Sequence, residues 1–209
     1  MDDATYWDMI RAERTRLAEV LADVGPGQWR TQSLCAAWSV EDVVAHLSAT
    51  ANTGRWAWIR NMVVSGFNST KHNERLLRRY LGDTQAETLA IFRRSVDLRI
   101  APTKDYAAFL GEVIVHSQDI AGPLGLAIDP DPVGLKAVAE FFATKDLAVR
   151  SRTLVRGLSL EASDAQFAIG QGPQVTGRLL DMVMAMAGRQ QYADDLSGDG
   201  AEELLRRMS

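Results

Sequence analysis

Two ionisable side chains stand one helical turn apart in an otherwise apolar run of this sequence. From Tyr106 to His116, the run carries only Glu112 and His116 as titratable groups besides the phenol at its start. A spacing of four residues places both side chains on one face of an α-helix. A buried carboxylate is costly unless it is paired, neutralised or bound to a metal. The pair is therefore a candidate for metal or acid–base chemistry.

A third candidate ligand, His46, lies in another amphipathic segment. Imidazole and carboxylate ligands suit Zn²⁺, and also Fe²⁺, Ni²⁺ or Mn²⁺. Three such ligands from two helices leave one coordination position for water or a substrate atom. The alternative is purely structural, with Glu112 and His116 as a hydrogen-bonded buried pair and His46 packed in the core. The spacing alone leaves both interpretations open.

Three further polar residues near these positions have simpler interpretations. His72 stands in a polar stretch and is expected at the surface. Cys35, in an apolar loop, is expected to be a small buried side chain rather than a nucleophile or a zinc ligand. Asp119 follows His116 by three residues, so it either orients the imidazole of His116 or caps local backbone or faces water.

Two arginines in the C-terminal part are candidates for binding a substrate carboxylate, namely Arg178 and Arg189. The alternative is electrostatic, since Arg189 follows a helix end where the helix dipole favours a cation. The glycine-rich stretch Gly170–Gly177 is not a dinucleotide-binding fingerprint, because Pro173 interrupts it and no second βαβ unit follows. A turn between a strand and a helix is the better interpretation.

The candidate ligands need helices to position them, and the first 122 residues predict four main ones. Ser39 and Asp42 form a capping box that starts the helix bearing His46. The helix bearing Glu112 and His116 ends near a Gly-Pro pair. Apolar spacing predicts these helices at about 3–24, 40–64, 84–96 and 106–122, with a short charged helix at about 73–80. A four-helix bundle with inward-facing residues is the natural arrangement.

The pattern changes after the sequence Asp-Pro-Asp-Pro at 129–132. A further helix, short alternating segments typical of strands, a buried helix and a final short helix follow. The chain is thus expected to be mainly helical, with a four-helix bundle at 1–128 and a small α/β domain at 129–209.

The composition excludes several classes of function. The net charge is −4 over 209 residues, so neither a basic nucleic-acid footprint nor a polybasic membrane patch is expected. No apolar run is long enough to span a membrane, and the N-terminus lacks the features of a secretory signal. The single cysteine, Cys35, fits a reducing cytoplasm.

Two motifs of the N-terminal part resemble the mycothiol-dependent maleylpyruvate isomerase family, which belongs to the DinB-like group of metal-binding bundles. They are Trp38–Leu47 and Gly111–Ile120. Three C-terminal stretches are similar to the second domain of the same family, namely Gly172–Arg178, Ala187–Arg189 and Leu196–Gly200. The resemblance thus spans nearly the whole chain.

The resemblance implies a zinc ion held by His46, Glu112 and His116, with mycothiol as co-substrate at the open position. The metal would lower the pKa of the thiol, and the thiolate would add to an electrophilic small molecule. The outcome is either cis–trans isomerisation or S-transfer, and Arg189 is the candidate for holding a substrate carboxylate. Two other functions remain open: a non-catalytic metal- or ligand-binding sensor, and a metal-dependent hydrolase for which Asp119 is the one nearby candidate base.

Overall fold

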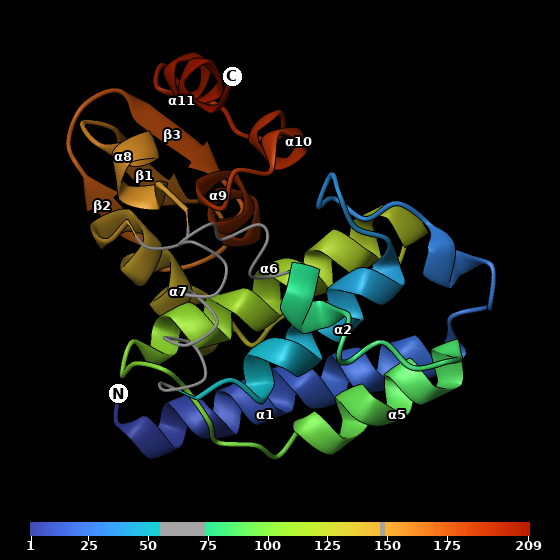
Figure 1. Ribbon diagram of the computed structural model, residues 1–209. Coiled ribbons are helices and arrows are strands. Elements are labelled where there is room, and N and C mark those ends of the chain that lie inside the picture. The colour runs from blue at the N-terminus through green and yellow to red at the C-terminus, as the bar shows by residue number, and fades with distance from the viewer. Residues whose placement is uncertain (55–73, 147–148) are drawn as a thin grey trace. The chain divides into compact units, whose positions relative to one another are not determined.

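In a computed structural model of the chain, the described residues are 1–54, 74–146 and 149–209. They divide into two compact units, Met1–Asp129 and Pro130–Ser209, and each is described by itself. The first unit is helical, and the second combines helices with a small sheet (Figure 1). The predicted fold class, a helical bundle followed by a small α/β part, is confirmed.

The first unit is a bundle of long helices. α1 packs against α6, while α2 packs against both α5 and α6. Buried side chains from these helices, among them Leu17, Leu47, Phe92 and Ile114, make the core between them. In the described part of this unit the bundle helices are α1 (Asp3–Val20), α2 (Val40–Ala51), α5 (Gln85–Ser95) and α6 (Tyr106–Leu124), with 3-10 turns at Leu21–Asp23 and Gln28–Arg30 and a single helical turn at 74–77.

The start of α2 is fixed by the capping box that the sequence predicts. The backbone N–H of Asp42 donates to Ser39 Oγ at 3.2 Å, and the backbone N–H of Ser39 donates to Asp42 Oδ2 at 2.9 Å. This start orients the apolar stripe of α2 toward the core, and His46 is buried with it. α2 ends at Ala51, so the expectation of one continuous helix to about residue 64 is wrong; residues 55–64 lie outside the described residues.

The long helix α6 is buried along most of its length, because its sequence is apolar on nearly every side. It ends at Gly125, whose φ of 64° is a left-handed conformation that glycine adopts without steric cost. The backbone N–H of Leu126 then donates to the carbonyl of Ala121 at 3.0 Å and closes the last turn. Glu112 and His116 consequently lie in the middle of a well-defined helix.

The second unit contains a small sheet with strand order β2-β1-β3 in its described residues. β1 pairs antiparallel with β2 and parallel with β3. The buried helix α9 packs against α7 and also contacts β1. The elements of this unit are α7 (Pro132–Thr144), α8 (Ser151–Val155), β1 (Ser159–Ala162), β2 (Ala168–Gly170), β3 (Gln174–Gly177), α9 (Leu179–Met186), α10 (Gln190–Ala193) and α11 (Ala201–Met208).

The glycine-rich stretch after β2 contains a strand that the sequence did not predict. Gly170 and Gly172 have φ values of 88° and 131°. A Cβ atom at either position would lie 2.2 or 2.1 Å from a carbonyl oxygen of the segment before β1, so the two glycines allow a close approach of backbone to backbone. The stretch therefore turns and then continues as β3, whose single buried residue, Val175, gives too weak a pattern to predict a strand.

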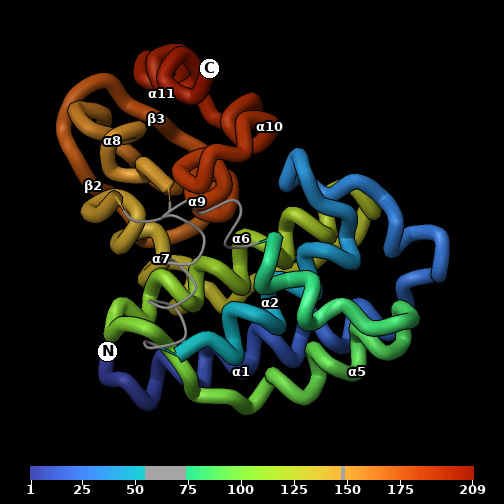
Figure 2. The backbone as a smooth tube through the Cα atoms, viewed as in Figure 1, coloured from blue at the N-terminus to red at the C-terminus, as the bar shows by residue number. Residues whose placement is uncertain are grey.

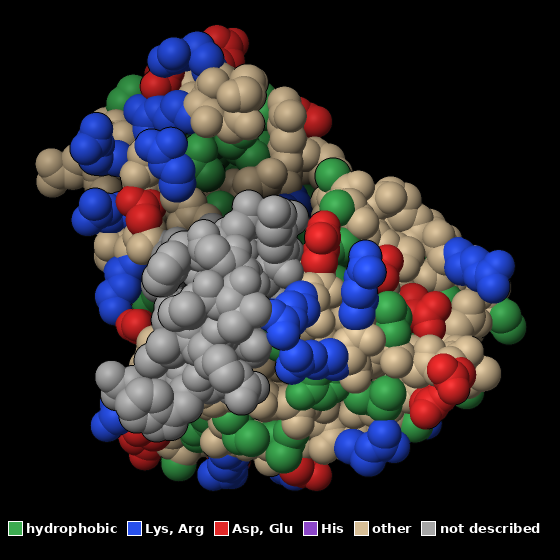
Figure 3. Space-filling view, viewed as in Figure 1, with side chains coloured by type: hydrophobic (Ala, Val, Ile, Leu, Met, Phe, Trp, Pro, Cys, Tyr) green, Lys and Arg blue, Asp and Glu red, His purple; other side chains and the backbone are tan. Residues whose placement is uncertain are grey.

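The surface agrees with the charge pattern of the sequence. On the face shown in Figure 3, basic and acidic side chains are interspersed. No helix among the described residues is long and apolar enough to cross a membrane.

Candidate metal centre

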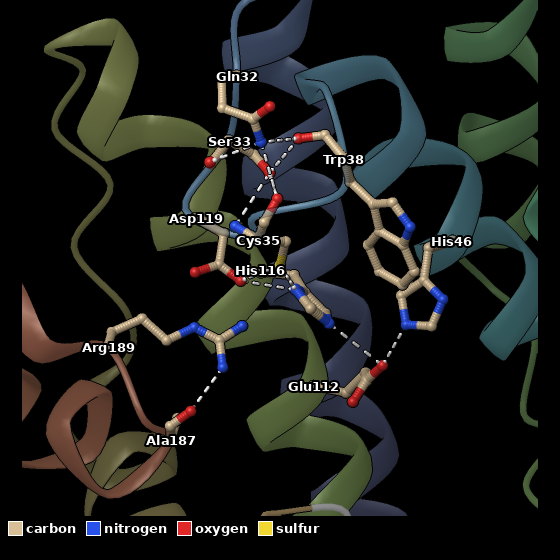
Figure 4. A network of polar contacts seen from close by, with 10 residues as sticks. All are labelled: Gln32, Ser33, Cys35, Trp38, His46, Glu112, His116, Asp119, Ala187 and Arg189. Carbon is tan, nitrogen blue, oxygen red and sulfur yellow. Dashed lines mark hydrogen bonds and ion pairs between the residues drawn. The ribbon is translucent and has the colours of Figure 1, made fainter. Parts of the chain in front are cut away.

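The structure brings the three predicted ligands together from α2 and α6. Nε2 of His46 lies 2.6 Å from Oε1 of Glu112, and Nε2 of His116 lies 3.4 Å from the same oxygen (Figure 4). The two helices that carry them pack directly against each other. Because Glu112 and His116 are one turn apart, a single residue on the facing helix completes the cluster.

The donor set fits a divalent cation. The ligand atoms of the three side chains all lie within 4.8 Å of one another. Ligands at about 2 Å from a tetrahedral zinc ion lie about 3.3 Å apart, so small rotations of the side chains suffice. Both histidines are buried, whereas the side chain of Glu112 keeps 29% of its exposure. The cluster is thus shielded from bulk water by protein but open at the carboxylate.

Glu112 and His116 shift each other's pKa in opposite directions. Burial alone raises the pKa of Glu112, but the charge of His116 and hydrogen bonds from both imidazoles outweigh burial and hold that pKa well below its usual value. Burial lowers the pKa of His116, but the charge of Glu112 and the hydrogen bond to Asp119 outweigh it and hold that pKa well above its usual value. A bound cation would take the place of these protons.

The second nitrogen of His116 contacts a buried carboxylate on the other side of the ring. Nδ1 lies 2.8 Å from Oδ2 of Asp119, whose side chain is fully buried. The same oxygen accepts a hydrogen bond from the thiol of Cys35 at 3.1 Å, and Sγ lies 3.6 Å from Nδ1. Asp119 therefore does not face water, and its geometry is the one that an orienting contact requires.

The segment between α1 and α2 reaches both imidazoles. Figure 2 shows this segment beside the C-terminal half of α6, where the backbone N–H of Leu34 donates to the carbonyl of Asp119 at 3.1 Å. The ring of Trp38 lies 4.7 Å from that of His46 and 6.3 Å from that of His116, centroid to centroid. One short segment thus packs against both rings of the cluster.

Sequence reasoning missed the place of Cys35 and Trp38 at the site. The sequence predicted Cys35 to be an inert small side chain, yet its thiol contacts Asp119 across a separation of 84 residues. No local spacing can predict a contact at that separation. The one available signal was that Trp38 opens the same family-like motif that contains His46.

The remaining predicted site residues lie in the second unit or outside the described residues. Arg178 is exposed and its Nε lies 3.8 Å from Asp164. Arg189 donates to the carbonyl of Ala187 at 2.6 Å (Figure 4). Both belong to the second unit. His72 lies outside the described residues.

Fold and site together define a helical-bundle protein with two histidines and a carboxylate converging inside the bundle, followed by a small α/β unit. Residues 10–108 match the family described as the mycothiol maleylpyruvate isomerase N-terminal domain. The match covers just under half of the chain, and it confirms the resemblance seen in the sequence. The matched range includes His46 and ends before Glu112.

Among solved structures, the chain is similar to the mycothiol-dependent maleylpyruvate isomerase at 15% identity, with a TM-score of 0.66 over 96% of this chain and 94% of that chain. A mutant of that isomerase with one histidine replaced by alanine matches over the same shares with the same TM-score, at 14% identity. At these identities the likeness shows a shared fold. A search of curated proteins found no match.

Proposed function

We propose that His46, Glu112 and His116 hold a divalent cation, with zinc the first candidate, and that the site activates a low-molecular-weight thiol. The observation that carries the proposal is the convergence of two imidazole nitrogens on one carboxylate oxygen, at 2.6 and 3.4 Å. Three protein ligands are typical of zinc sites that keep a position open for a substrate atom. The family match supports mycothiol as that thiol.

The residues of the chain have distinct roles in this proposal. His46 and His116 supply neutral nitrogen donors, and Glu112 supplies the negative charge that balances part of the charge of the cation. The carboxylate of Asp119 keeps the proton of His116 on Nδ1, which leaves Nε2 available as a ligand. When bound, the cation supplies Lewis acidity, which lowers the pKa of a coordinated thiol and yields a thiolate near neutral pH.

The thiolate is suited to adding to an electrophilic double bond, as in the isomerisation of maleylpyruvate. Its sulfur bonds to one carbon of a conjugated cis double bond, and an electron pair moves onto the adjacent carbonyl oxygen. The resulting single bond rotates. Return of the electron pair restores the double bond in trans geometry and expels the same thiolate, so no oxidant or reductant is consumed. S-transfer to another electrophile would use the same first step.

The second unit supplies the candidates for holding the substrate carboxylate. Arg189 remains the first candidate and Arg178 the second, because a guanidinium binds a carboxylate through two parallel hydrogen bonds. The reaction needs a reduced thiol. A chain with a single cysteine cannot form an intrachain disulfide, which agrees with the reducing cytoplasm as its location.

The hydrolase alternative receives no support from the position of Asp119. Its carboxylate contacts Nδ1 of His116 and the thiol of Cys35, on the side of the imidazole ring opposite Nε2. It is therefore not placed to act as a general base toward water at the cluster.

The direct test is metal analysis of the purified protein, followed by calorimetric titration with mycothiol and an assay with maleylpyruvate. We expect about one zinc ion per chain and thiol binding only in the metal-loaded form. His46→Ala should lose both metal and thiol-dependent turnover, whereas His72→Ala, which changes the remaining histidine, should keep both.

The other outcomes distinguish the alternatives. Metal binding without turnover for any thiol and electrophile would favour a binding module. Turnover without a thiol would favour a hydrolase, and full activity in metal-free protein would refute the proposal.

A further inference from the structure

We propose that Cys35 is a positioning residue for His116, acting through the buried carboxylate of Asp119. The thiol donates to Oδ2 of Asp119, and that oxygen holds the Nδ1–H of His116, so that Nε2 points toward Glu112 and His46. The inference rests on the proposed metal site and extends it to a residue outside the ligand set.

The contacts of Asp119 supply the first argument. Its side chain is fully buried, and an ionised carboxylate only accepts hydrogen bonds. Oδ2 receives two donors, the thiol of Cys35 at 3.1 Å and Nδ1 of His116 at 2.8 Å. Each donor lowers the cost of keeping a charge at this buried position. Loss of the thiol would remove one of the donors that constrain this carboxylate.

The anchoring of the segment around Cys35 supplies the second argument. The backbone N–H of Cys35 donates to Ser33 Oγ at 3.1 Å, and that hydroxyl donates to the carbonyl of Trp38 at 2.7 Å. The neighbouring N–H of Leu34 donates to the carbonyl of Asp119. Backbone and side chain of Asp119 are therefore both tied to the same segment (Figure 4). This two-point attachment fixes where the thiol stands relative to the imidazole.

A competing arrangement uses the same atoms differently. Cys35, His116 and Asp119 also bring three possible ligand atoms within 4.8 Å of one another, so Cys35 could itself be a metal ligand. Nδ1 lies closer to the carboxylate oxygen, at 2.8 Å, than to the sulfur, at 3.6 Å. These distances favour a hydrogen-bonded chain from thiol to carboxylate to imidazole over metal ligation by Cys35. The experiment below separates the positioning role from the ligand role.

The test compares Co²⁺ binding by the metal-free full-length chain in its wild-type, Cys35→Ala and Cys35→Ser forms. Alanine removes the donor and serine restores one. We expect alanine to weaken Co²⁺ affinity about tenfold and serine to stay within about threefold of wild type, as for other residues that orient ligands. The matched control is Ser117→Ala, because the hydroxyl of Ser117 is buried beside His116 and has no hydrogen-bond partner among the described residues. It should bind Co²⁺ like wild type.

The absorption spectrum of the cobalt form supplies a second readout. A positioning role predicts no sulfur-to-cobalt charge-transfer band in the wild type, whereas such a band, lost in Cys35→Ala, would make Cys35 a ligand and overturn the inference. Equal affinities of the alanine variant and the wild type would also overturn it. A wild type that binds no Co²⁺ would instead refute the proposed metal site itself, and the inference with it.

Melting curves of the metal-free variants show whether each one folds. Should Cys35→Ala not fold, Cys35→Ser and Asp119→Asn decide the matter. The asparagine variant is expected to weaken Co²⁺ binding by about tenfold or more, since its amide oxygen is uncharged. Wild-type affinity in Asp119→Asn would contradict a chain that acts through this carboxylate.

Discussion

In the proposed metal site, a proton and the cation would compete for Nε2 of His116. Its pKa lies well above the usual value in the metal-free protein, because the charge of Glu112 and the hydrogen bond to Asp119 outweigh the effect of burial. His116 must lose a proton to bind a cation, so affinity falls as the pH falls below that raised pKa. We expect a change of about tenfold per pH unit while one proton is displaced.

Titration with Co²⁺ at a series of pH values from about 5.5 to about 8 would measure how the affinity depends on pH. This range brackets the ordinary pKa of histidine. Release of protons on binding, followed in a weakly buffered solution, is the independent check. An affinity that stays constant across this range would contradict a ligand role for His116.

At the scale of elements, the cap of α2 matters because this helix carries His46. Ser39→Ala removes the side-chain half of the capping box, and we expect the free energy of unfolding to fall by about 1 kcal/mol. Cation affinity should fall as well, since the first turns of α2 would fray and His46 would be held less firmly. Urea unfolding and Co²⁺ titration measure the two effects.

The matched control lies in α5. Thr84 caps that helix by accepting a hydrogen bond from the backbone N–H of Glu87 at 3.2 Å, and α5 carries no member of the cluster. Thr84→Ala should therefore lower stability by a similar amount and leave Co²⁺ affinity unchanged. A parallel loss of affinity in both variants would mean that general stability, rather than the position of His46, governs binding.

The same elements show what sequence alone could predict. The capping box of α2 and the pairing of Glu112 with His116 are local patterns, with partners three and four residues apart, so spacing was enough. The convergence of His46 on this pair needed the bundle arrangement, and the family resemblance supplied it. The contacts of Cys35 and Trp38 depend on how an irregular segment lies against α6, and β3 depends on close backbone approaches at Gly170 and Gly172. The spacing of apolar and polar residues along the sequence cannot predict contacts of this kind.

At the scale of the whole molecule, the cluster belongs entirely to the unit Met1–Asp129. A ligand that binds only the folded state suppresses local unfolding of the segments that form its site. We expect zinc to slow amide hydrogen exchange mainly in α2, α6 and the segment 32–38. Exchange in metal-free and zinc-loaded protein, followed by mass spectrometry, tests this expectation. Protection concentrated in Pro130–Ser209 would place the cation outside the cluster.

The central claim is that His46, Glu112 and His116 hold a cation with one position open to a thiol. X-ray absorption of the zinc-loaded protein, with and without mycothiol, tests it most directly. We predict nitrogen and oxygen ligands alone in the free protein, and one added sulfur at about 2.3 Å when mycothiol is present. Sulfur bound before mycothiol is added, or an unchanged zinc environment afterwards, would contradict the account.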